Sequence, residues 1–294
     1  GVDGDVDPVT GVTVELKNGV GTVTATHVEG TTWTADVSGG KLADGTVTVS
    51  ASVTDDAGNP ASAADVTFDL DTSADKAPGL AVAFIDAGDY AGDGDLNAAE
   101  VGGTTLKISG YDADTVGLRV TVVDSASDVA SIELYADPVM GLGISAHLPD
   151  DVTDATVSLV FAGESGPSYT LLAERTEIPG LDKSTGEIRV SYQVDPTGAA
   201  GANAVALAGI GGLFATGADL YGSIITESGA NAFGLFADGN LSATVEVLDA
   251  AGNEADSSVT VDKDTQIGTP TLTVSDVNFD SSDSVTITLD GVDG

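Results

Sequence analysis

The residues best suited to chemistry are oxygen ligands in one short acidic loop, DYAGDGDLNAAE, at residues 89–100. Twelve-residue calcium loops alternate oxygen ligands, turn sharply at a glycine in position 6 and end on a glutamate at position 12. Gly94 and Glu100 occupy these two positions. Position 3 is an alanine, and Asp86, which lies upstream of the loop, could supply the ligand that is missing there. A solvated acidic turn is the alternative. The predicted Ca²⁺ ligands are Asp86, Asp89, Asp93, Asp95, Asn97 and Glu100.

Smaller acidic clusters stand where sequence patterns begin or end. Asp3, Asp5 and Asp7 alternate near the start, and Asp71 and Asp264 close two similar segments. Crowded carboxylates repel one another, and a bound cation turns that repulsion into rigidity. These five aspartates are therefore predicted as further Ca²⁺ ligands, with a solvated cluster as the alternative at each place.

The chain offers little for catalysis. It contains no cysteine and two histidines, His27 and His147, without the spacing of a histidine metal pair. His27 lies in an alternating segment, VTATHV, where a polar position on a strand is the ordinary explanation. GESG at residues 163–166 is not a nucleophile elbow, because its second glycine falls one position early. We therefore expect no enzymatic activity.

The amino-acid composition excludes several classes of binding partner. The 294 residues include 47 acidic and 9 basic side chains, for a formal net charge of -38. Such a field repels nucleic acid and anionic membranes. The 41% of hydrophobic residues is too high for a disordered acidic tail. The longest apolar run, at residues 204–215, is too short to cross a bilayer. These features fit a folded extracellular protein that does not bind nucleic acid and does not insert into a membrane.

The elements that would position the acidic residues include a repeated hairpin. Residues 42–59, LADGTVTVSASVTDDAGN, align without a gap to residues 236–253, FADGNLSATVEVLDAAGN. After one gap, residues 66–69 align with residues 259–262. Apolar residues alternate with Thr and Ser before an Asp/Gly/Asn turn, and a second alternating run follows. This pattern predicts two β-hairpins.

A weaker internal match links SVTITLDGVD at residues 284–293 to GTTLKISGYD at residues 103–112. It predicts three segments: residues 1–77 as a repeat without its first strands, residues 78–266 as a full repeat, and residues 267–294 as the opening strands of another. The tail of one unit would then complete the head of the next, in the same chain or by strand donation between subunits. Frayed or truncated ends are the alternative.

Three segments resemble the bacterial immunoglobulin-like repeats of giant Bap-type and RTX-type biofilm adhesins. They are the hairpin motif, the segment TTWTADVSGG at residues 31–40 and the segment GDGDLNAAEV at residues 92–101. The resemblance implies β-sandwich modules that extend an adhesin from the bacterial surface and are stiffened by calcium at their junctions. Trp33 has no counterpart before Phe236, which departs from the family pattern. The expected fold is all-β: tandem immunoglobulin-like sandwiches, the second with a long β-rich insertion.

The insertion covers about residues 125–235. Strand-like runs are predicted at residues 130–135, 155–161, 169–173 and 187–194. A Gly/Ala-rich stretch of loops or close-packed short elements follows, with a short helix near residues 204–208. The insertion either elaborates the sandwich or binds a carbohydrate or peptide. An exposed patch of Leu207, Ile210, Leu213 and Phe214 would indicate a protein interface.

These features favour a structural repeat of a calcium-stabilised bacterial adhesin or extracellular filament, acting in cell adhesion or biofilm formation. Its partners would be neighbouring repeats or copies of itself. The alternatives are a glycan- or protein-binding module carried by the insertion, and a surface-layer or sheath subunit that polymerises by strand donation.

Overall fold

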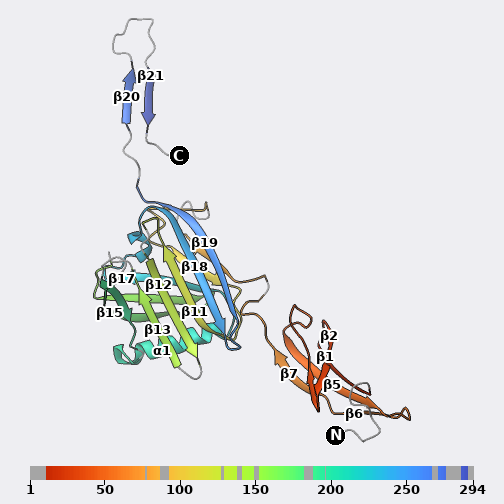
Figure 1. Cartoon of the computed structure of the whole chain (residues 1–294). Coiled ribbons are helices and arrows are strands. Elements are labelled where there is room, and N and C mark those ends of the chain that lie inside the picture. The colour runs from red at the N-terminus through yellow and green to blue at the C-terminus, as the bar shows by residue number, and fades with distance from the viewer. Residues whose placement is uncertain are drawn as a thin grey trace. The chain divides into compact units, whose positions relative to one another are not determined.

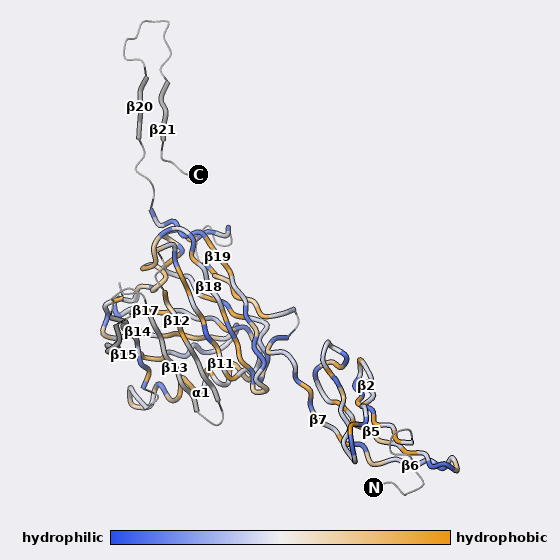
Figure 2. The backbone as a smooth tube through the Cα atoms, viewed as in Figure 1, coloured by the Kyte–Doolittle hydropathy of each residue, from blue (hydrophilic) through white to orange (hydrophobic). Residues whose placement is uncertain are grey.

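The structure is a computed structural model, and it describes residues 11–76, 78–86, 93–126, 129–137, 141–148, 152–181, 188–195, 197–266, 271–275 and 286–290. The chain divides into two compact units, residues 1–73 and 74–294. Strands dominate both (Figure 1), so the coarse prediction of a mostly β protein is confirmed, with one α-helix added. Hydrophobic and hydrophilic residues are interleaved along the strands (Figure 2), as half-buried sheets require.

The first unit is built around one sheet in the order β2-β1-β5-β6, with β7 also paired to β5. Its strands are β1 (Val12–Lys17), β2 (Thr22–Thr24), β5 (Gly45–Thr54), β6 (Pro60–Ser62) and β7 (Val66–Leu70). Strands β3 (Thr26–Glu29) and β4 (Thr32–Thr34) form a separate hairpin, in which His27 meets Trp33 edge to face. Among residues 11–73, which the structure describes, the buried apolar residues are few: Ala25, Leu42 and Val47.

The second unit contains a twelve-stranded sheet in the order β8-β10-β17-β14-β15-β16-β13-β12-β11-β18-β19-β9. Neighbouring strands are antiparallel except for the parallel pair β19 and β9. The strands are β8 (Ala81–Ile85), β9 (Asp95–Asn97), β10 (Thr105–Ser109), β11 (Thr115–Val123), β12 (Val129–Asp137), β13 (Gly141–His147), β14 (Thr156–Gly163), β15 (Ser168–Leu181), β16 (Ile188–Gln193), β17 (Leu220–Thr226), β18 (Gly239–Asp249) and β19 (Glu254–Asp264).

Three short helices and a further hairpin complete the part of this unit that the structure describes. Helix α1 (Ala202–Phe214) follows the 3₁₀ turn η1 (Ala199–Gly201), and η2 (Ala232–Leu235) precedes β18. Strands β20 (Thr271–Ser275) and β21 (Thr286–Asp290) pair antiparallel as a sheet of their own. No described helix is long and apolar enough to cross a membrane.

One core serves the whole twelve-stranded sheet. Strand β8, at one end of the sheet, packs against β18 and β19 near the other end, so the sheet closes over its apolar side chains. Leu106 of β10, Leu159 of β14 and Leu241 of β18 all belong to this core. The insertion therefore extends the sheet of the second unit and shares its core.

Helix α1 packs against β13, β14 and β15. Its Leu207, Ile210 and Phe214 are at most 3% exposed, and Leu213 packs against the same core. These apolar residues therefore form no exposed patch, and the interface that such a patch would have indicated loses its support.

The four strand-like runs of the insertion are confirmed to within one residue by β12, β14, β15 and β16, except that residue 187 lies outside the described residues. The Gly/Ala-rich stretch forms close-packed short elements, the second of the two alternatives: α1 is longer than expected, and β17 lies within the sheet between β10 and β14. Glycine explains part of this difference. A Cβ at Gly209 would lie 2.0 Å from the Tyr169 ring, so the missing side chain lets α1 approach β15.

Candidate metal centre

Three predicted ligands converge in the second unit. Asp86, Asp93 and Glu100 each place one carboxylate oxygen so that the three oxygens lie within 4.8 Å of one another. Asp86 directly follows β8, whereas Asp93 and Glu100 lie on either side of β9. Asp86 is half-buried, Asp93 is exposed and Glu100 is buried. We call this group the acidic trio.

Glu100 is the most unusual member, because only 1% of it is exposed. Its Oε2 accepts a hydrogen bond of 3.1 Å from the Asn97 backbone N–H. In return, the side-chain oxygen of Asn97 accepts bonds from the N–H groups of Ala99 (2.8 Å) and Glu100 (3.3 Å). This reciprocal pair has the pattern of a capping box and fixes the Glu100 carboxylate.

The other oxygen of Glu100, Oε1, is buried and accepts no hydrogen bond within the part of the chain that the structure describes. A buried polar atom without a partner costs about 1–3 kcal/mol, and more when it is charged. Two further carboxylates beside it add repulsion. A divalent cation would relieve both costs, and carboxylate oxygens suit calcium. The donor set of the trio therefore fits a hard cation.

The loop is held in place by the core. Gly94 adopts φ +100°, which favours glycine and gives the sharp turn that the sequence predicted. Leu96, in β9, is 1% exposed, and Val101 is 8% exposed. The Thr104 hydroxyl donates to the Glu100 carbonyl at 3.1 Å, and the Thr104 carbonyl accepts from Asn231 at 2.6 Å. The turn that carries Glu100 is therefore held on one side by the buried Leu96 and on the other by Val101 and the Thr104 hydrogen bonds.

The remaining predicted ligands have other positions. Asp3, Asp5, Asp7 and Asp89 lie outside the described residues. Asp95 is exposed, and its N–H donates to the Asp93 carboxylate at 3.0 Å.

Asp264, the last residue of β19, is the register partner of Asn97, and its carboxylate accepts from the Gln266 N–H at 3.0 Å. Asp71 follows β7 in the first unit. Neither residue belongs to the acidic trio. Their calcium role, like that of Asp95 and Asn97, stays a prediction.

The Asp/Gly/Asn turns of the two repeated hairpins use their carboxylates locally. The Asn59 N–H and side-chain amide donate to the two oxygens of Asp55, each at 2.7 Å. Asn253 donates to Asp249 in the same way, again at 2.7 Å for both bonds. The hydrogen bonds from Asn59, first its side chain and then its backbone, lower the pKa of Asp55. Turn geometry therefore accounts for these aspartates.

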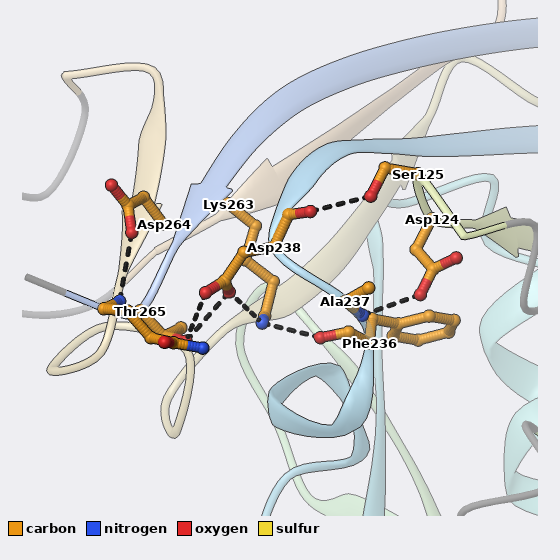
Figure 3. A network of polar contacts seen from close by, with 9 residues as sticks. Asp124, Ser125, Phe236, Ala237, Asp238, Lys263, Asp264 and Thr265 are labelled. Atoms are coloured by element: carbon orange, nitrogen blue, oxygen red, sulfur yellow. Dashed lines mark hydrogen bonds and ion pairs between the residues drawn. The ribbon is translucent and has the colours of Figure 1, made fainter. Parts of the chain in front are cut away.

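A buried ion pair closes the second hairpin (Figure 3). Lys263 is 1% exposed, and its Nζ donates to the Phe236 carbonyl at 2.7 Å and to the Asp238 carboxylate at 2.8 Å. Thr265 also donates to Asp238 at 2.8 Å. Burial would raise the pKa of Asp238, but the bonds from Lys263 and Thr265 outweigh it and lower that pKa.

The sequence analysis missed this pair. Its signal is a lysine in a chain with only 9 basic residues, placed on the apolar side of an alternating strand, VTVDKD. A lysine at such a position needs a buried counter-charge, and Asp238 supplies it.

Comparison with the solved structures gives five similar chains, including the following two. One is a tetra-tandem repeat in the extending region of a large adhesion protein, with 18% identity, a TM-score of 0.22 and coverage of 99% of this chain and 83% of that chain. The other is a Ca²⁺-stabilized adhesin that helps an Antarctic bacterium reach out and bind ice, with 18% identity, a TM-score of 0.21 and coverage of 93% and 70%. These scores are too low to support an argument.

Comparison with the curated proteins gives no match. Residues 2–72 do match the family described as the bacterial Ig-like domain. The resemblance to bacterial immunoglobulin-like repeats is thereby confirmed for the first unit.

Proposed function

We propose that the chain is a calcium-stabilised structural segment of a bacterial surface adhesin or extracellular filament, which extends the protein from the cell for adhesion or biofilm formation. The match of residues 2–72 to the bacterial Ig-like domain supports the module type. The recurrence of the same hairpin in β18 and β19 supports a repeated architecture. The acidic trio around the buried Glu100 is the observation that carries the calcium role.

Calcium would act as a brace within the second unit. Asp86 follows β8, which packs against β19, and Glu100 follows β9, which pairs with β19. An ion held by the acidic trio would therefore tie the β8 end to the β9 turn. It would also reduce the self-repulsion of a chain with net charge -38, which otherwise opposes a compact state.

Thermal unfolding of the full chain in calcium and in excess EDTA tests this function. We expect a higher melting temperature in calcium, because an ion that binds only the folded state stabilises it by mass action. An equal melting temperature in both solutions would contradict the calcium role.

Glu100→Gln keeps an acceptor for the Asn97 N–H but removes a charge from the acidic trio. This variant should lose most of the calcium response and should be at least as stable as the parent chain in EDTA. The matched control is Glu164→Gln, which changes an exposed glutamate between β14 and β15 and should keep the full response. A full calcium response in Glu100→Gln would remove the acidic trio as the site.

A further inference from the structure

Two hairpins of the chain share one design. Strand β21 aligns with β10 over its whole length, and the first residue of each pairs with the last residue of its partner strand: Thr286 with Ser275, and Thr105 with Ile85. The inward-facing apolar positions of β8 and β10 are Val82, Phe84, Leu106 and Ile108. The corresponding positions of β20 and β21 are all apolar as well: Leu272, Val274, Ile287 and Leu289.

In the second unit the β8–β10 hairpin covers the repeated hairpin formed by β18 and β19. Leu106 and Ile108 are at most 5% exposed, and β8 packs against both β18 and β19. Val259 and Val261 of β19 pack against the same core. The second unit therefore shows how a hairpin of the β18–β19 type is covered by one of the β8–β10 type.

The first unit carries the same inward face, and among its described residues (11–73) Val47 on that face is buried, whereas the side chains on the edge strand β7 are not covered by a hairpin of the β8–β10 type. Val66 and Phe68 of β7 occupy the positions of Val259 and Val261, and they pair with Val49 and Val47 as those residues pair with Ala243 and Leu241. Val66 is 65% exposed and Phe68 is 41% exposed. Adjacent exposed apolar side chains on a β-strand are a typical docking surface.

We propose that the β20–β21 hairpin of a second copy of this chain docks on the β5–β7 face of the first unit, in the way that β8–β10 covers β18–β19. The donor and acceptor surfaces are different, so the contact is heterologous and leaves one free donor and one free acceptor at the ends of each assembly. Such contacts propagate into open filaments where the rotation between copies does not close a ring. The inference deepens the filament role in the proposed function, but it rests on the internal repeat and not on calcium.

The net charge of the chain predicts how this docking depends on salt. Two copies of net charge -38 repel each other at long range, and salt screens that repulsion. Apolar docking between like-charged chains should therefore strengthen as the NaCl concentration rises. An interface made of ion pairs would weaken instead.

Sedimentation velocity of the full chain across a protein concentration series tests the inference. It is run in EDTA, so that loss of calcium binding cannot affect the result. We expect species larger than a dimer that increase with protein and salt concentration. A chain that remains monomeric throughout would overturn the inference.

Three variants identify the surfaces. Phe68→Ser removes the acceptor face, and Ile287→Ser weakens the donor hairpin; Val66→Ser serves as a second acceptor variant. Each variant alone should be monomeric, whereas an equimolar mixture of Phe68→Ser and Ile287→Ser should form a heterodimer through the intact donor of one and the intact acceptor of the other. Val20→Ser is the control, because Val20 is 72% exposed and lies outside the docking face.

Trp33 fluorescence and far-UV circular dichroism verify that each variant is folded. Continued self-association of both single variants, or a mixture that stays monomeric, would contradict the head-to-tail contact. Either result would leave the calcium role of the acidic trio untouched, so the two proposals fail separately.

Discussion

The repeated hairpins β5–β7 and β18–β19 have the same local structure and different surroundings. Each opens on a glycine of positive φ, +111° at Gly45 and +108° at Gly239, and each closes its turn with the same aspartate–asparagine bonds of 2.7 Å. Yet Val53 of β5 is half-buried, whereas its counterpart Val247 is 2% exposed. The comparison shows that turn chemistry is set locally, while burial depends on the strands that pack on top.

A second difference lies in the return strand. Strand β19 pairs with β18 in one unbroken register, whereas β6 and β7 pair with β5 in registers that differ by one residue. The extra residue is a β-bulge between β6 and β7. This extra residue is also the single gap in the sequence alignment of the two hairpins. The first hairpin therefore accommodates one more residue and still forms.

The third difference is Lys263, which replaces Leu70 of the first hairpin. In the first unit Asp44 is exposed and accepts from the Thr72 N–H and hydroxyl at 2.9 and 2.6 Å. In the second unit the corresponding Asp238 also neutralises a buried lysine. The covered hairpin thus depends on a charge pair that the uncovered hairpin lacks.

Removing that pair should give the largest difference between the hairpins. We expect Asp238→Ala to cost the second unit about 3 kcal/mol, because it leaves the buried Lys263 without a counter-charge. Asp44→Ala should cost the first unit about 1 kcal/mol, the usual value of a lost hydrogen bond. Urea unfolding measures both: Trp33 fluorescence reports the first unit, and the transition in far-UV circular dichroism that Trp33 does not follow reports the second.

The double variant Asp238→Ala/Lys263→Leu restores the leucine of the first hairpin and should recover most of the loss, because an apolar side chain can replace a buried pair. Equal losses for the two single aspartate variants would mean that the lysine does not distinguish the hairpins.

Truncation of the equivalent valine in each hairpin measures how much more deeply the second hairpin is buried than the first. Val247→Ala removes two fully buried methyl groups and should cost about 2 kcal/mol, at about 0.8 kcal/mol per buried carbon plus a cavity term. Val53→Ala changes a half-buried position and should cost about half as much. The same urea experiment applies. A larger loss in the first unit would contradict the assignment of β18–β19 as the covered hairpin.

Acid should weaken the second hairpin through Asp238. Because the folded pKa of this carboxyl is lowered, its ionised form contributes stability above the unfolded pKa of about 4. That contribution is lost as the pH falls through the folded pKa. Asp238→Asn should therefore flatten the decline of the second unit's urea midpoint on acidification. An unchanged pH dependence would show that Asp238 does not contribute to it.

The features that were predictable from the sequence are local. Alternation and the Asp/Gly/Asn turn identified both hairpins, and the spacing of the acidic loop selected Asp86, Asp93 and Glu100, which the fold brings within 4.8 Å of one another. Each of these signals spans fewer than about 20 residues, the range over which strand period and turn chemistry act.

The features that escaped prediction depend on long-range contacts. Strand β17 pairs with β10 and β14, both distant in sequence, and its Gly/Ala-rich surroundings gave no alternating pattern of their own. The burial of Lys263 depends on Phe236 and Asp238, which lie across the hairpin. Tertiary packing of this kind overrides local propensity.

Hydrogen–deuterium exchange of the full chain, read separately over β5–β7 and β18–β19, tests the central comparison most directly, because both hairpins are observed in one molecule. The structure predicts much slower exchange in β18–β19, and it predicts that calcium slows exchange further in β9 and β19, which adjoin the acidic trio. Similar exchange in the two hairpins, or a calcium effect that leaves β9 and β19 unchanged, would contradict the account.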